Sequence, residues 1–106
     1  MRAPTVDIQE VTRRIVKMAH PHKVVLFGSR ARGQARPDSD WDILVIADSQ
    51  RSRHERAAPL YGVLRDIRQQ VDILVYTPEE AEAWKNVPQA LVTTATREGK
   101  VLYERS

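Results

Sequence analysis

The chain has 106 residues, no cysteine, and a formal net charge of +3 from 17 basic and 14 acidic residues. This length predicts one domain, 1–106, and the absence of any apolar run of roughly 18 residues argues against a membrane span. Without an apolar signal segment or cysteine, a cytoplasmic location is expected. Two Trp, three Tyr and one Phe are scattered singly, so we expect no aromatic stacking surface and no direct binding of nucleic acid.

Apolar spacing and turn residues predict a compact α/β (α+β) domain. His20-Pro21 ends the first helix, because the residue before proline is biased away from the α region. Thr77-Pro78-Glu79-Glu80 is typical of a helix start, with a capping threonine, a proline in the first turn and a glutamate three residues after the cap. In chain order we expect a helix over 6–19, a strand over 24–27, a short helix starting at or just after residue 29, a strand over 42–47, a helix over 53–69 that is irregular at Pro59, a strand over 71–77, helix in one or two pieces from 78 to about 97, and a strand over 101–104.

Two aspartates, Asp40 and Asp42, open the strand over 42–47. Side chains two residues apart on a strand share a face, with Cα atoms about 6.6 Å apart. Carboxylates this close repel each other unless a cation lies between them or one is protonated. Their oxygens suit Mg²⁺ or Mn²⁺, with substrate phosphates completing the coordination shell. An isolated Asp-x-Asp is more typical of a polar strand start in which Asp40 caps a turn, so the spacing alone does not establish a metal site.

A third aspartate, Asp72, lies within an aliphatic strand. Its neighbours are expected to bury it, and burial of an unpaired carboxylate costs several kcal/mol. The run from Asp72 to Val75 repeats the run from Asp42 to Val45, as though two neighbouring strands bring their acids to one edge. Asp72 could ligate metal or accept a proton from an attacking hydroxyl. The alternative is an edge-strand aspartate that faces water or pairs with an arginine.

The turn after the strand over 24–27 is suited to anion binding. Gly28 allows a sharp turn whose amides can cradle phosphate oxygens, and Ser29 adds a hydroxyl donor. The Gly-x4-Gly-Lys pattern of a P-loop is absent. Arg30 and Arg32 can reach a polyphosphate, or one of them can pair with a neighbouring aspartate.

Other polar and aromatic residues receive no chemical role. Trp41 should point away from the acids into the core. Tyr61, Tyr76 and Tyr103 are expected to be packing residues whose hydroxyls are solvated. The sequence assigns no role to three histidines and three arginines: His20, His22, His54, Arg51, Arg53 and Arg56.

Together, Gly28-Ser29, ten intervening residues and Asp40-x-Asp42 resemble the signature of the DNA polymerase beta-like nucleotidyltransferase superfamily. The fuller string, Gly-Ser-Arg-Ala-Arg-Gly followed by Ser-Asp-x-Asp, resembles its small prokaryotic branch, the minimal nucleotidyltransferases (MNT). The resemblance implies a nucleotidyltransferase fold, a small mixed sheet flanked by helices. It also implies a nucleoside triphosphate bound through the Gly28-Ser29 turn, with Mg²⁺ or Mn²⁺ on Asp40 and Asp42 and with Asp72 as the third acid.

Minimal members of that family are commonly antitoxins encoded beside HEPN-domain toxins, which are ribonucleases, and some transfer AMP from ATP to a tyrosine of the toxin. The resemblance therefore implies protein adenylylation, a HEPN-domain partner and a hetero-oligomer. Two other classes remain open: a binding module that neutralises a toxin with a vestigial nucleotide site, and an enzyme that modifies a small molecule.

Overall fold

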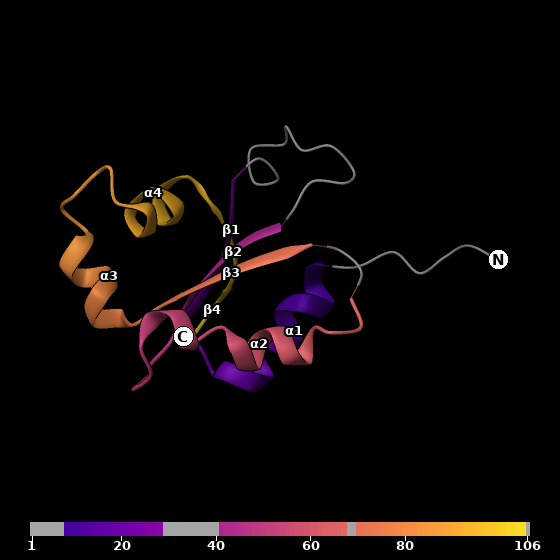
Figure 1. Cartoon of the computed structure of the whole chain (residues 1–106). Helices are drawn as coiled ribbons and strands as arrows, with labels where there is room; N and C mark the ends of the chain where they lie inside the picture. The colour runs from indigo at the N-terminus through magenta and orange to yellow at the C-terminus, as the bar shows by residue number, and fades with distance from the viewer. Residues whose placement is uncertain (1–7, 29–40, 68–69, 106) are drawn as a thin grey trace.

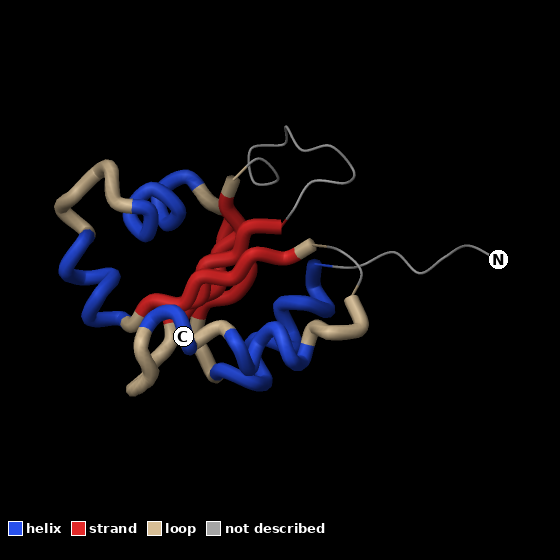
Figure 2. The backbone as a smooth tube through the Cα atoms, in the orientation of Figure 1, coloured by secondary structure: helices blue, strands red, loops and turns tan. Residues whose placement is uncertain are grey.

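A four-stranded sheet lies between two layers of helices in the computed structural model, which describes residues 8–28, 41–67 and 70–105. Helices α1 and α2 cover one face of the sheet and α3 and α4 cover the other (Figures 1 and 2). The elements are α1 (Ile8–Ala19), β1 (Lys23–Phe27), β2 (Trp41–Ile46), the 3₁₀ helix η1 (Arg53–Glu55), α2 (Ala58–Val63), β3 (Val71–Tyr76), α3 (Pro78–Trp84), α4 (Leu91–Glu98) and β4 (Lys100–Glu104).

The sheet is mixed, with the strand order β3-β2-β1-β4. β1 is antiparallel to both β2 and β4, whereas β2 and β3 are parallel. A hydrophobic strand alternates its side chains between the two faces, so both faces of β2 contribute to a core. The expected mixed sheet flanked by helices is confirmed.

Each face of the sheet has its own hydrophobic core. On the α1/α2 face, the fully buried Val11 and Ile15 of α1 pack with Trp41 and Ile43 of β2. On the α3/α4 face, Val92 and Ala95 of α4 pack with apolar residues of the first three strands: Val25, Leu44, Ile46 and Tyr76. The sheet is therefore packed on both faces by helices.

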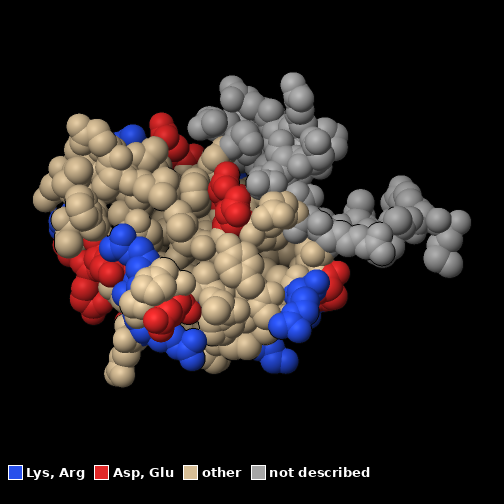
Figure 3. All heavy atoms as spheres, viewed as in Figure 1, with Lys and Arg blue, Asp and Glu red and all other residues tan. Residues whose placement is uncertain are grey.

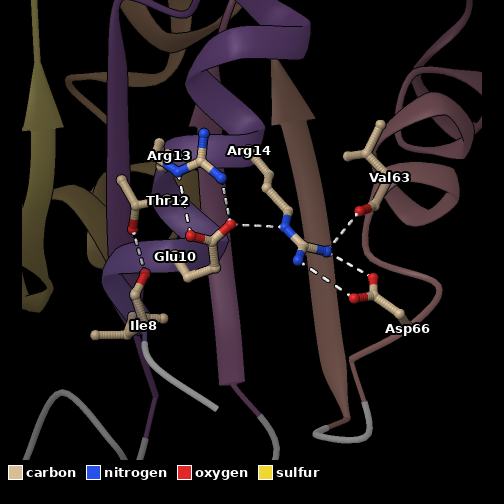
Figure 4. Close-up of polar contacts among 7 residues, drawn as sticks. All are labelled: Ile8, Glu10, Thr12, Arg13, Arg14, Val63 and Asp66. Carbon is tan, nitrogen blue, oxygen red and sulfur yellow. Dashed lines mark hydrogen bonds and ion pairs between the residues drawn. The ribbon is translucent and has the colours of Figure 1, made fainter.

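Arg14 joins α1 to the end of α2 (Figure 4). Its guanidinium donates to Glu10 at 2.8 Å, to Asp66 at 2.6 and 3.2 Å, and to the Val63 carbonyl at 3.1 Å. The hydrogen bonds from Arg13 and Arg14 lower the pKa of the Glu10 carboxyl to about 2. One cation thereby connects the two helices that cover the same face of the sheet.

Local sequence signals account for several helix ends. α1 ends where the His20-Pro21 pair predicts, with His20 in the left-handed region at φ 48°. Histidine is among the residues that adopt this region more readily than most. At α3 the predicted capping box is confirmed: Thr77 Oγ1 accepts from the Glu80 amide at 3.2 Å, and the Glu80 carboxylate accepts from the Thr77 amide at 2.9 Å.

One predicted helix is much shorter than expected. In place of a helix over 53–69, the chain forms η1 and then a six-residue α2. Pro59 lies at the start of α2, where a proline is tolerated, and Gly62 weakens the helix interior. The short helix expected from residue 29 lies outside the described residues. No helix of the described segments is long and apolar enough to cross a bilayer.

Candidate active site

Asp42 and Asp72 lie side by side on adjacent parallel strands. They are register partners in the β2–β3 pairing, and neighbouring strands lie about 4.8 Å apart. Trp41 and Ile43, which flank Asp42, are buried in the α1/α2 core, so Asp42 faces the α3/α4 side. Register partners share a face, and therefore the Asp72 side chain points to the same side. The expected packing of Trp41 in the core and the expected meeting of the two acids are both confirmed.

Gly28 lies at the same end of the sheet, directly after β1. It follows Phe27, whose register partner on β2 is Asp42, and it adopts φ +76°. A Cβ at residue 28 would lie 2.3 Å from the Asp42 carboxylate oxygen Oδ2, so the Asp42 side chain would have to move. Glycine is therefore required here both for the left-handed turn and for the close approach of the carboxylate.

The exposure of Asp72 differs from the prediction. Its aliphatic neighbours were expected to bury it, but its side chain is exposed, whereas Asp42 is half-buried. The cause is the sheet order, because β3 is an edge strand and Asp72 lies near its beginning, ahead of the part of the face that α3 covers. The predicted burial of Asp72 is therefore wrong, and its pairing with Asp42 follows from the register of β2 and β3 instead.

Several predicted site residues lie outside the described segments. The structure therefore says nothing of the positions expected to bind phosphate and the first carboxylate: Ser29, Arg30, Arg32 and Asp40. Among the described residues, Gly28, Asp42 and Asp72 lie together at this end of the sheet. Acidic atoms reach the surface near the beginnings of β2 and β3 in Figure 3.

This donor set suits a hard divalent cation. Asp42 and Asp72 offer only oxygen atoms, which are the ligands that Mg²⁺ and Mn²⁺ prefer, and two carboxylates on one face repel unless a cation or a proton compensates them. Among the described residues no three side chains of His, Cys, Asp or Glu gather as a metal site. A site on this edge would thus draw its remaining ligands from substrate phosphates, water or residues outside the described segments.

Two side chains that received no role from the sequence hold β3 in place. The Tyr61 hydroxyl accepts a hydrogen bond of 2.8 Å from the Ile73 amide, immediately after Asp72, a contact that the sequence did not predict. Arg56 donates to the Val75 carbonyl at 3.2 Å and to the Glu80 carboxylate at 2.6 and 3.2 Å. Both arrangements join residues distant in sequence, so no local signal could have revealed them.

Hollows lie beside the acids and at the opposite end of the sheet. A cavity of about 180 Å³ adjoins the site, between Phe27 and Gly28 on one side and Leu91, Thr94 and Glu98 of α4 on the other. A larger hollow, about 750 Å³, lies at the Lys23 and Ile46 end of the strands. Those positions are register partners four residues away from the Phe27–Asp42 pair. The large hollow is therefore separate from the paired carboxylates.

Comparisons with known proteins point to one family. Residues 9–106 match the family model described as Polymerase beta, Nucleotidyltransferase. The protein adenylyltransferase MntA of Aphanizomenon flos-aquae (strain 2012/KM1/D3) is 28% identical to this chain over 115 residues, which cover 97% of this chain and 71% of MntA.

Two solved structures share the fold. A crystal structure from Sulfolobus solfataricus, of a protein classed as a nucleotidyltransferase, matches with a TM-score of 0.61 and 26% identity over 92% of this chain and 78% of that one. A toxin–antitoxin crystal structure with AMP-PNP matches with a TM-score of 0.58 and 22% identity over 92% of this chain and 74% of that one. The family match runs through nearly the whole sequence, and the chain belongs to the Polymerase beta, Nucleotidyltransferase family.

Proposed function

We propose that this nucleotidyltransferase transfers AMP from ATP to a hydroxyl group of a partner protein. The observation that carries the proposal is the register pairing of Asp42 with Asp72 beside Gly28. The similarity of nearly the whole chain to MntA, which is named a protein adenylyltransferase, supports AMP as the transferred group and a protein as its acceptor.

Each site residue has a proposed task. The turn at Gly28 and Ser29 binds the triphosphate through backbone amides, assisted by Arg30 and Arg32. Asp40, Asp42 and Asp72 hold Mg²⁺ or Mn²⁺. The positions of Gly28, Asp42 and Asp72 at one end of the sheet support their proposed tasks. The tasks of the other residues are proposed from the sequence motif.

The transfer step is a substitution at phosphorus. The acceptor oxygen forms a bond to the α-phosphorus of ATP, the bond from that phosphorus to the bridging oxygen breaks, and pyrophosphate leaves. The Asp72 carboxylate is exposed, so it is accessible to take the proton of the acceptor hydroxyl. A bound divalent cation supplies stabilisation of the negative charge that develops on the attacking and leaving oxygens.

We further propose that the acceptor is a HEPN-domain toxin, which this chain neutralises in a hetero-oligomer. The motif supports this pairing because it resembles that of minimal nucleotidyltransferases. Fold similarity to a toxin–antitoxin structure is consistent with such a partner.

The test uses the complex with the protein encoded by the adjacent reading frame. We expect α-phosphate-labelled ATP to label that partner in the presence of Mg²⁺, and intact mass to show added AMP. Asp42→Asn should abolish labelling, whereas Asp48→Asn is the matched control because Asp48 is exposed after the opposite end of β2. Undiminished labelling by the Asp42 variant would contradict the proposal, and a partner neutralised without added AMP would favour the binding module.

A further inference from the structure

A second hollow lies on the same face as the acids, further along β3. It has a volume of about 160 Å³, and its walls are Arg53, Tyr76, Trp84, Leu91 and Val92 together with Ala90. Leu91 also lines the cavity beside Gly28. Leu91 is thus a wall of both hollows, and we call the surface that they line, from Gly28 past Leu91 to Trp84, Tyr76 and Arg53, the groove.

Two large apolar side chains in the walls of this groove are exposed. Leu91 is 47% exposed and Trp84 is 43% exposed, although both are side chains that folding normally buries. Figure 3 shows largely uncharged surface between the acidic atoms and the α3/α4 side. Tryptophan is enriched among the residues that dominate binding energy at protein interfaces.

The far end of the groove is cationic. The Arg53 guanidinium stacks on the Tyr76 ring at 4.5 Å from its centroid, and its side chain is 49% exposed. Its ion pair with Glu80 is long, 3.7 Å, because the Glu80 carboxylate is engaged by Arg56 at 2.6 Å. Arg53 can thus offer donors to a negatively charged group of a ligand.

The dimensions favour a polypeptide segment as the occupant. A cavity of about 150 Å³ accommodates one benzene-sized ring, so the second hollow fits a single side chain rather than a nucleoside. Tyr76 and Asp72 share a face four residues apart on β3, which corresponds to roughly 13 Å at about 3.3 Å per residue. An extended peptide could place one side chain in this hollow while another reaches the carboxylates.

We propose that this groove binds the acceptor polypeptide, with an apolar or aromatic side chain between Trp84 and Leu91 and an acidic side chain on Arg53. The inference rests on the proposed transfer of AMP to a protein hydroxyl and names the surface that selects the acceptor. The hydroxyl to be modified then lies on the part of the segment nearest Asp42 and Asp72.

The test selects peptides from a random-peptide phage library on the immobilised full-length chain without nucleotide, and measures binding of the synthetic peptides by fluorescence anisotropy. We expect the selected peptides to share a bulky apolar residue and an aspartate or glutamate. Trp84→Ala and Leu91→Glu should each weaken binding about tenfold or more. Arg53→Glu should reverse the preference for acidic peptides.

Matched controls distinguish the groove from surface effects in general. Met18→Glu alters an equally exposed apolar residue, 45%, on the opposite helical layer, and Arg65→Glu reverses an exposed arginine beyond α2. Both should bind the peptides as the wild type does. The groove proposal is overturned if no peptide is selected, or if the selected peptides bind the Trp84 and Leu91 variants unchanged. It is also overturned if those variants lose affinity for AMP-PNP rather than for peptide.

The two proposals fail in different ways. Groove-dependent peptide binding without any transfer of AMP to the partner would contradict the proposed function, whereas the groove would still be supported as a peptide-binding surface. Normal transfer of AMP, together with peptide affinities that do not change in the Trp84 and Leu91 variants, would contradict the groove proposal alone.

Discussion

The Asp42 carboxylate occupies the space that a side chain at residue 28 would need. The Oδ2 atom of Asp42 lies 2.3 Å from the position of a Cβ on Gly28, and the glycine has φ +76°. Gly28→Ala therefore forces both an unfavourable backbone and a displacement of Asp42. We expect a loss of about 1–3 kcal/mol in the free energy of unfolding, measured by urea denaturation, together with loss of ATP binding by calorimetry.

Gly62 provides the control for that substitution. No atom lies within 4 Å of a Cβ built on Gly62, which is inside α2. Gly62→Ala should stabilise the protein by about 0.4–1 kcal/mol and leave ATP binding intact. Equal ATP affinity in the two alanine variants would refute the role assigned to the Gly28–Asp42 contact.

Tyr61 should stabilise the edge of β3 next to Asp72. Tyr61→Phe removes the acceptor of the Ile73 amide without removing the ring, so the expected loss is about 1 kcal/mol. Hydrogen exchange followed by NMR should show faster exchange at the Ile73 amide than in the wild type. Tyr103→Phe is the control, since its hydroxyl makes no hydrogen bond with the described residues. Unchanged exchange at Ile73 would show that this hydrogen bond does not protect the strand edge.

The ion pair between Arg56 and Glu80 should make stability depend on pH. The hydrogen bond from Arg56 lowers the pKa of the Glu80 carboxyl from 4.5 to about 2. A carboxyl whose pKa is lowered by folding contributes stability above its unfolded pKa and loses it as the pH falls. Glu80→Gln, which keeps a capping residue, should cost about 2 kcal/mol at neutral pH. The difference from the wild type should shrink as the pH falls from 4.5 toward 2.

Glu82 is the control for this charge effect. Its carboxylate pairs with Lys85 at the surface, where both side chains are largely exposed. Because exposed pairs contribute little, Glu82→Gln should change the free energy of unfolding by less than about 0.5 kcal/mol at any pH. A pH-independent effect of Glu80→Gln would show that the loss comes from packing rather than from charge.

The sequence predicted those features that depend on neighbouring residues. The α3 start follows from Thr77 and Glu80 alone, and the strand containing Asp42 follows from its continuous apolar run. Both are local consequences of capping chemistry and hydrophobicity. The meeting of Asp42 and Asp72 was also predictable, because the two strands repeat the same four residues.

Features that depend on the sheet order could not be predicted in the same way. The exposure of Asp72 follows from the position of β3 at an edge, which its aliphatic neighbours do not reveal. Likewise, the Tyr61–Ile73 hydrogen bond and the groove at Leu91 arise only when α2 and α4 pack against the sheet. The length of α2 was overestimated because apolar spacing continues beyond the point where the helix ends.

The pairing of Asp42 with Asp72 as one metal–nucleotide site is tested most directly by crystallography with Mn²⁺ and AMP-PNP. Anomalous scattering should place a manganese ion in contact with both carboxylates, beside the turn at Gly28. A nucleotide-bound crystal with its manganese elsewhere, or in contact with neither carboxylate, would contradict the central claim.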